Sequence, residues 1–296
     1  MKYKVQPTPE PLRDYVEHLW TVTVDEEEPP DLNLKFFVTC APCLVFQHHH
    51  GRSAIARRIP AAGGEVRNRN HPTLFIRGPI TQPFQCVAEG TLTAIGVELK
   101  PQALNTLFNV DGAELTDGIV ELNAFSMEKL DERLLDAENE RDQIAVVTQF
   151  LRARANSAPQ ADALVAESLR LIHQSIGSIH VRHLLKRLSM SERQFERRFR
   201  RVVGIPASLY LRIMRFQGAV RLMKAGGVER LSDIAYDLGY ADQSHFIKDV
   251  REFTGYTPKS LSHAVGESVT ETQNRALVRQ RILMEQDWCG LRSVEE

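Results

Sequence analysis

The sequence has few cysteines, no long apolar run and no apolar segment near its start. Four cysteines in 296 residues are too few for a disulfide framework and fit a reducing compartment. No run of about 18 apolar residues is present, which excludes a transmembrane helix. The first residues also lack the apolar core of a secretory signal. We therefore expect a cytoplasmic protein with no membrane partner. The remaining composition, 43% hydrophobic and 25% charged, is typical of globular domains, and the length suits two of them.

The net charge of −1 conceals an uneven distribution along the chain. Residues 166–264 contain 17 lysines and arginines and nine acidic residues, whereas the rest of the chain has nine more acidic than basic residues. A basic domain joined to an acidic one is typical of regulators in which one part meets phosphate. The same excess also fits a well-solvated helical surface, so charge alone leaves both interpretations open.

The first hundred residues favour short strands. Apolar runs at 36–38, 44–46, 74–76 and 92–99 are separated by glycine- and proline-containing turns, which predicts a small β-barrel or sandwich. Helical periodicity begins at Pro101. Helices are expected at residues 101–108, 126–136, 141–155 and 161–175, either covering the barrel or pairing across a dimer. Residues 156–160 are the best linker, and a helical or disordered tail is expected from residue 266.

The basic region contains an internal repeat of about 50 residues. Each copy begins with a short helix whose apolar positions match after 50 residues: Val181, Leu184, Leu185 and Leu188, then Leu231, Ile234, Ala235 and Leu238. A tight turn follows, and a second helix begins at an N-cap residue, Ser191 in one copy and Asp242 in the other, with Gln194 completing a capping box. A short helix, a tight turn and a second helix predict a helix-turn-helix in each copy.

The second helices of the two copies align at a constant offset of 51. The matched residues are Phe195 and Phe246, Phe199 and Val250, Val202 and Phe253, and Gly204 and Gly255. The first three pairs predict a buried face, and the glycines predict left-handed helix ends. Residues 207–224 between the copies predict a helix of roughly 27 Å, which can hold two recognition helices about 34 Å apart, one turn of DNA.

These residues resemble the DNA-binding domain of the AraC/XylS family of transcription regulators, over roughly residues 166–264. The most specific part is S-D-I-A-Y-D-L-G-Y-A-D-Q-S-H-F at 232–246, followed by F-T-G-Y-T-P at 253–258. One departure is Asp249–Val250, where many members have a small residue and then Phe. The N-terminal part is similar, more weakly, to a sensor-like domain of some such regulators. That similarity rests on Pro11, Leu12, Tyr15, Val16 and Trp20, on R-G-P at 77–79 and on G-V-E-L-K-P at 96–101.

The resemblance implies an α+β chain with three parts. Residues 1–155 are expected to form a cupin-like β-barrel with following helices, and 156–264 an all-α domain with two helix-turn-helix motifs, followed by a tail at 265–296. By position in the family motif, Arg193, Glu196 and Arg197 contact bases, and their chemistry suits guanine and cytosine. In the second copy the same helical phase exposes Gln243, Ser244, His245 and Lys248, while Arg200, Arg201 and Arg251 are better placed for phosphate.

Other candidate sites are weaker. Cys40 and Cys43 form a C-x-x-C without a second cysteine pair, and they offer a thiol switch or half a zinc site. Residues 48–50 are three histidines, of which only His48 and His50 can share a face of a strand. A metal-dependent cupin enzyme needs further ligands, and His71 is the only later histidine of the barrel region, so no catalytic residue, metal or cofactor is expected. Five aromatic residues are candidates for an effector pocket, or ordinary core: Tyr15, Trp20, Phe36, Phe37 and Phe84.

The sequence therefore predicts a DNA-binding transcription regulator, not an enzyme, controlled by an effector or partner of its N-terminal domain. Double-stranded DNA is the expected partner, with RNA polymerase and a second copy of the chain as further candidates. The competing interpretations are a DNA-repair protein or a thiol- or metal-responsive protein that uses the helix-turn-helix module to reach DNA.

Overall fold

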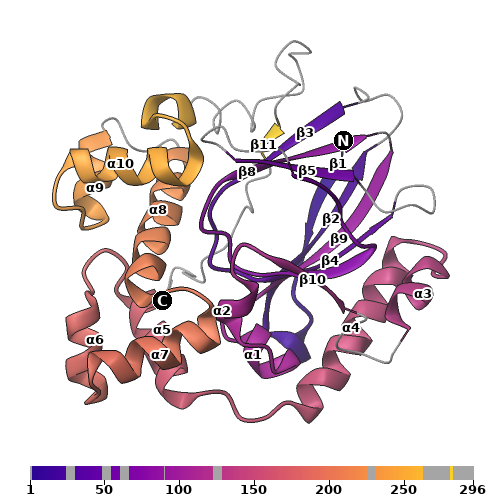
Figure 1. Cartoon of the computed structure of the whole chain (residues 1–296), viewed down its shortest axis with the longest axis horizontal. Coiled ribbons are helices and arrows are strands. Elements are labelled where there is room, and N and C mark those ends of the chain that lie inside the picture. The colour runs from indigo at the N-terminus through magenta and orange to yellow at the C-terminus, as the bar shows by residue number, and fades with distance from the viewer. Residues whose placement is uncertain are drawn as a thin grey trace.

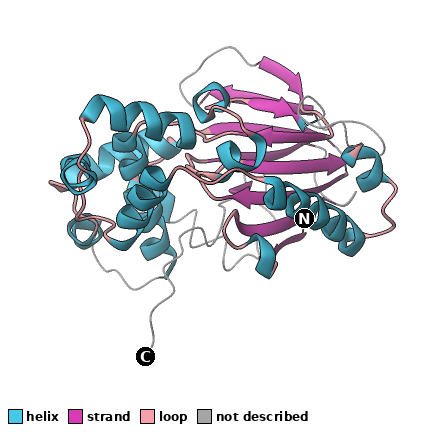
Figure 2. Ribbon diagram, turned by 90° about the horizontal axis from the view of Figure 1, so that it is seen from below, coloured by secondary structure: helices cyan, strands magenta, loops and turns pink. Residues whose placement is uncertain are grey.

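A computed structural model describes residues 2–24, 31–48, 55–60, 67–89, 91–122, 129–225, 231–262 and 281–282. The molecule has a sheet-rich N-terminal part and a helical C-terminal part that lie side by side (Figures 1 and 2). This is the α+β division that the sequence predicts.

The N-terminal part consists of two sheets, antiparallel apart from one short strand. The larger has the order β1-β2-β9-β4-β7-β10, with β1 Lys2–Gln6, β2 Val16–Val24, β9 Leu92–Leu99, β4 Cys43–His48, β7 Leu74–Arg77 and β10 Ile119–Glu121. The smaller has the order β11-β3-β8-β5-β6, with β11 Arg281–Ile282, β3 Asp31–Phe36, β8 Phe84–Glu89, β5 Ile55–Pro60 and β6 Arg67–Asn70. In Figure 1 the two sheets face one another, as expected for a cupin-like barrel.

Close packing at glycine fixes the centre of the larger sheet. Trp20 of β2 pairs in register with Gly96 of β9, and a Cβ on Gly96 would lie 2.0 Å from the indole ring. Only glycine leaves room for the tryptophan at that position. The G-V-E-L-K-P stretch therefore has a packing role in the sheet.

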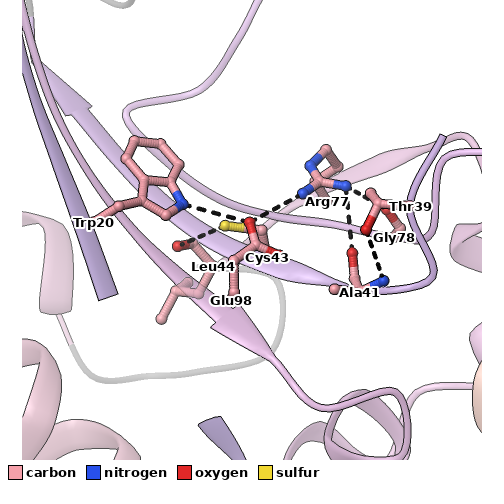
Figure 3. Close-up of polar contacts among 8 residues, drawn as sticks. All are labelled: Trp20, Thr39, Ala41, Cys43, Leu44, Arg77, Gly78 and Glu98. Carbon is pink, nitrogen blue, oxygen red and sulfur yellow. Dashed lines mark hydrogen bonds and ion pairs between the residues drawn. The ribbon is translucent and has the colours of Figure 1, made fainter. Parts of the chain in front are cut away.

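A buried ion pair lies beside this contact (Figure 3). Arg77 Nη2 is 3.3 Å from Glu98 Oε1, and the Glu98 side chain is fully buried. The indole Nε1 of Trp20 donates to the same carboxylate oxygen at 3.4 Å, and Arg77 Nη1 donates to the carbonyl of Ala41 at 3.4 Å. Because a buried charge is costly unless it is paired, each member depends on the others. The network joins three strands to the loop that carries Cys40.

Helices cover one end of the larger sheet. They are the 3₁₀ helix η1 Glu10–Leu12, α1 Ala103–Phe108, α2 Gly112–Leu115, α3 Leu130–Leu135 and α4 Glu140–Ser157. Asn139 caps α4 by accepting from the backbone N of Asp142. Phe150 and Leu151 of α4 are buried with Leu104 of α1 and Leu44 of β4, so these helices belong to the N-terminal core.

The C-terminal part contains six helices in its described residues: α5 Ala163–Gln174, α6 Val181–Leu188, α7 Glu192–Val203, α8 Ala207–Ala225, α9 Leu231–Asp237 and α10 Gln243–Thr254. In Figure 1 the long helix α8 stands between the pair α6 and α7 at one end and the pair α9 and α10 at the other. This is the arrangement that the sequence repeat predicts.

The structure departs from the sequence predictions at three places. Strand β3 ends at Phe36, so residues 37 and 38 lie in a loop rather than in a strand. Within the predicted helix 126–136 the described helix is α3, which begins at Leu130, while residues 126–128 lie outside the described residues. In the tail, Arg281 and Ile282 form β11, parallel to β3, rather than helix or disorder. Among the described helices, none combines the length and the apolar character needed to cross a bilayer.

Candidate DNA-binding site

The second helix of each helix-turn-helix unit has the N-cap and the C-cap glycine expected from the sequence. The predicted capping box is different in detail, because Gln194 Oε1 accepts from the Ser191 hydroxyl at 3.0 Å and not from the Ser191 backbone N. The Ser191 hydroxyl accepts from the backbone N of Gln194 at 3.4 Å, and Asp242 Oδ1 accepts from the backbone N of His245 at 2.9 Å. Gly204 (φ 97°) and Gly255 (φ 75°) end α7 and α10 in the left-handed conformation. The same caps at both ends give the two recognition helices, α7 and α10, the same length of 12 residues.

The predicted buried faces are also present. The six apolar residues that the repeat aligns are all at most 4% exposed: Phe195, Phe199 and Val202 of α7, and Phe246, Val250 and Phe253 of α10. Beneath α7, Tyr210 of α8 packs edge-on to Phe199, and its hydroxyl lies 2.8 Å from Nε2 of His173 on α5. Burial, and secondly the positive charge of Lys100, lower the pKa of His173 to about 4.

The two units touch through their backbones at a pair of glycines. Gly177 precedes α6, Gly239 ends α9, and a Cβ on Gly239 would lie 1.7 Å from the carbonyl oxygen of Gly177. Both glycines have positive φ angles, 93° and 67°, so side chains are excluded by conformation as well as by space. Together with α8, which spans about 28 Å for its 19 residues, this contact joins the units.

Each recognition helix is tied to an earlier part of the domain by an ion pair at the same position of the repeat. Arg198 Nε of α7 is 2.9 Å from Oδ2 of Asp162, the N-cap residue of α5. Arg212 Nη2 of α8 is 2.6 Å from Oδ1 of Asp249 on α10. Arg198 and Asp249 match at an offset of 51, and Asp162 and Arg212 at an offset of 50. We call these two contacts the cross-helix ion pairs; their charges are reversed between the copies.

The second cross-helix ion pair explains the departure from the family motif at residue 249. The Asp249 side chain is 10% exposed, and it accepts from both Nε and Nη2 of Arg212. The same guanidinium lies 2.8 Å from Glu252 and stacks over the ring of Phe253, 4.9 Å from its centroid. Because the carboxylates hold the proton on Arg212 against the effect of burial, the pKa of Arg212 is raised. An acidic residue fits here because its arginine partner is present.

Nine of the ten residues predicted to meet DNA are exposed: Arg193, Arg197, Arg200, Arg201, Gln243, Ser244, His245, Lys248 and Arg251. Glu196 is half-buried, and its Oε2 accepts from the backbone N of Ala207, the first residue of α8, at 3.4 Å. A carboxylate there also complements the positive end of the helix dipole. Glu196 therefore has a structural contact that the sequence did not predict.

His245 is exposed but held in place. Its Nδ1 lies 2.9 Å from Oδ2 of Asp242, the cap of the same helix. The hydrogen bond from the His245 backbone, followed by the contact with its ring, lowers the pKa of Asp242. This contact fixes the orientation of the ring at the start of α10.

The outer faces of the two shorter helices differ in charge, which the repeat did not predict. On α6 the exposed residues include Arg182, Lys186 and Arg187, and the matching positions of α9 are Ser232, Tyr236 and Asp237. Tyr236 is 84% exposed. The basic face of α6 can lie against phosphate, whereas Asp237 and its neighbour Asp233 disfavour the same approach by α9. The excess of basic residues in the sequence is the signal that could have pointed to α6.

A family model for a helix-turn-helix domain matches residues 184–264, which include both recognition helices and α8. The C-terminal region is an AraC-type DNA-binding domain. The chain is accordingly a transcription regulator that binds double-stranded DNA. A second model, a domain of unknown function (DUF6597), matches residues 3–121, the two-sheet part that precedes the AraC-type domain.

Several solved structures are partly similar to this chain. ToxT from Vibrio cholerae is 13% identical, with a TM-score of 0.46, over 83% of this chain and 98% of ToxT. The DNA-binding domain of the transcription factor AdpA, solved with a target DNA, is 23% identical, with a TM-score of 0.34, over 38% of this chain and all of that chain. The C-terminal domain of AraT, a response regulator from Geobacillus stearothermophilus, is 19% identical, with a TM-score of 0.33, over 34% of this chain and 85% of that one. No curated protein sequence matches this chain significantly.

The weaker candidate sites of the N-terminal part are separated in space. Cys40 and Cys43 are both fully buried: Cys40 packs with the core of the AraC-type domain, and Cys43 with Val45 and Phe75. His49 and His50 lie outside the described residues. Among the described residues there is no group of three or more His, Cys, Asp or Glu side chains suited to a metal.

The five aromatic residues proposed for a pocket also fall into different clusters. Phe36 and Phe84 stack with centroids 4.9 Å apart, and both pack with Trp20. Tyr15 packs on the core beneath α1 and α4, and Phe37 packs into the AraC-type domain. Only Trp20, Phe36 and Phe84 remain together as the candidate wall of an effector site.

Proposed function

We propose that this chain is a sequence-specific regulator that reads two successive major grooves with one AraC-type domain, under the control of its N-terminal domain. The observation that carries the proposal is the pair of recognition helices, each with an exposed polar face above a buried apolar one. In our proposal Arg193 and Arg197 pair with guanine, and Gln243 pairs with adenine. Ser244 and His245 add less selective contacts.

Phosphate contacts supply the rest of the affinity in this proposal. Arg200, Arg201, Lys248 and Arg251 are exposed on α7 and α10, and basic residues of α6 extend the same surface. Glu196 keeps its hydrogen bond to the start of α8, which limits how far its carboxylate can reach toward cytosine. The chain acts where the DNA is, in the cytoplasm, and we assign it no catalytic activity.

We assign control to residues 1–155, the DNA-binding function to 156–264 and no role to the tail at 265–296. An effector or partner of the N-terminal domain changes DNA binding only if it binds the DNA-competent arrangement with a different affinity. RNA polymerase and a second copy of the chain are the further partners that we propose. In this proposal the effector is a small molecule or a protein. Its binding is to be tested by substitution of Trp20, Phe36 and Phe84.

The test is selection of bound duplexes from a random-sequence pool by the full chain, followed by titration with salt. We expect one enriched sequence, and an affinity that falls steeply between about 50 and 200 mM salt, as phosphate contacts require. Arg197→Ala and Arg170→Ala form a matched pair, because Arg170 is exposed on α5, where it pairs with Glu167. Failure to enrich any sequence, or equal effects of the two variants, would contradict the proposed reading surface.

A further inference from the structure

Both recognition helices end against the N-terminal domain, and they do so at equivalent points. Gly204 follows α7 and Gly255 follows α10, and these two glycines are 51 positions apart, like the buried residues of the two helices. The N-terminal domain touches Gly204 itself and, at the second helix, Tyr256 directly after Gly255. We call these contacts the domain interface.

At α7 the two backbones nearly meet. The Thr116 hydroxyl donates to the carbonyl of Gly204 at 2.7 Å. A Cβ on Gly112 would lie 2.7 Å from the backbone N of Gly204, and a Cβ on Gly204 would lie 3.1 Å from the ring of Pro79. Helix α2 therefore fits only because both sides lack side chains at this point.

At α10 the contact is aromatic and apolar. Phe37 lies edge-on to Tyr256, with ring centroids 6.2 Å apart and planes at 83°. Phe37, Val38, Cys40 and Ala41 belong to the same buried cluster as the core of the C-terminal helices, and Cys40 is fully buried there. The loop after β3 is thus part of the core of the DNA-binding domain.

One motif of the N-terminal domain supports both contacts. Arg77, held by Glu98, donates to the carbonyl of Ala41 in the loop that reaches the second unit. Gly78 packs so closely on α2 that a Cβ there would lie 2.0 Å from the carbonyl of Leu115. The R-G-P motif therefore touches both contacts: Arg77 bonds the loop at Ala41 (Figure 3), and Gly78 packs on α2.

We propose that the N-terminal domain fixes the separation of the two recognition helices, and thereby the spacing between the two DNA half-sites, the stretches read by α7 and by α10. Within the described residues of the DNA-binding domain the units are connected by helix α8, by the contact of Gly177 with Gly239 and by a buried apolar cluster that includes residues of both. The domain interface adds a connection at each recognition helix and opposes rotation of one unit against the other. It leaves the DNA-facing residues exposed, so its effect is on geometry and not on access.

Two variants perturb the domain interface without altering any residue placed on DNA. Gly112→Ala adds a Cβ against the backbone of Gly204. Phe37→Ala combined with Thr116→Val removes the contacts to Tyr256 and Gly204. Gly118→Ala is the matched control, since its Cβ would lie 3.4 Å from the carbonyl of Leu115, an ordinary contact.

The experiment rests on the proposed function and uses the full chain with a duplex selected from a random-sequence pool. Affinity is compared between that duplex and versions with one base pair inserted between or deleted from the half-sites, which rotates one half-site by about 36°. We expect the insertion to weaken the unaltered chain and Gly118→Ala at least about tenfold, and both interface variants less than about threefold, because their units adapt.

Alkylation of Cys40 by N-ethylmaleimide, followed by peptide mass spectrometry, measures loosening of the domain interface without DNA. Cys40 is expected to react faster in both interface variants than in the unaltered chain, while thermal unfolding shows that the variants are folded. If the interface variants lose as much affinity on insertion as the unaltered chain, the proposal is overturned, whatever the rate at Cys40. If the unaltered chain selects no duplex, the proposed function itself fails, and this inference fails with it.

Discussion

Acid is expected to destabilise the DNA-binding domain through one partly buried histidine, His173. Its pKa is lowered to about 4 from an ordinary value of 6.5, chiefly by burial and secondly by Lys100. A histidine with a lowered pKa in the folded state binds fewer protons than it does in the unfolded chain. The contribution of His173 to the free energy of unfolding is therefore highest above pH 6.5. It decreases as the pH drops from 6.5 to about 4 and does not change further below that.

The size of this effect follows from the two pKa values. At pH 7 His173 is neutral in the folded chain and mostly neutral in the unfolded chain, so its titration lowers the free energy of unfolding by only about 0.2 kcal/mol. At pH 5 it is protonated in the unfolded chain and neutral in the folded one, which costs about 2 kcal/mol. The loss is a large fraction of the stability of a domain, and it affects the Tyr210 contact beneath α7 directly.

The assay is urea unfolding of the full chain followed by circular dichroism at pH 7, 6 and 5. In His173→Gln the group cannot titrate, so the variant should lose about 2 kcal/mol less than the unaltered chain between pH 7 and pH 5. His183→Gln is the matched control, because His183 is exposed on α6. Parallel pH profiles of His173→Gln and the unaltered chain would refute the assignment of a partly buried, neutral histidine.

Three further predictions concern the DNA-binding domain. Arg197→Ala should cost about 1–3 kcal/mol on the selected duplex and relax discrimination at one base pair; equal losses on selected and random duplexes would instead indicate a phosphate contact. Double-mutant cycles on Arg212 and Asp249 should give a coupling of about 1–2 kcal/mol in unfolding, against less than about 0.5 for the exposed pair Lys129 and Glu132, and equal couplings would contradict the buried geometry. Gly239→Ala should destabilise the chain by at least about 3 kcal/mol, because its Cβ would meet the Gly177 carbonyl at a positive φ, whereas Gly118→Ala should be mild; similar melting temperatures for both would exclude the close contact.

The local features of the DNA-binding domain could be predicted from the sequence. Caps, turns and buried faces depend on residues within a few positions of one another, and Ser191, Asp242, Gly204 and Gly255 all have the predicted roles. The register of the repeat also follows from apolar spacing alone. This is why both recognition helices, and the exposure of Arg193, could be placed before the structure was seen.

The domain interface could not be predicted, because it depends on pairs that are far apart in the chain. Gly112 and Gly204 contact each other across 92 positions, and nothing in either neighbourhood indicates the partner. Phe37 was expected to lie in the barrel, but its side chain packs in the core of the DNA-binding domain. Glu196 was predicted to contact a base from its position in the family motif, whereas its bond to the backbone of Ala207 depends on how α7 meets α8, which the motif does not specify.

The reversed charges of the cross-helix ion pairs restrict how the two copies can be recombined. A chimera that places the sequence of α7 in the position of α10 would bring Arg198 opposite Arg212, and the reverse exchange would bring Asp249 opposite Asp162. Each recognition helix must therefore be moved together with its partner, although the two helices have equal lengths and caps. Engineering of a new operator preference should therefore exchange α5, α6 and α7 together, or α8, α9 and α10 together, and not the recognition helix alone.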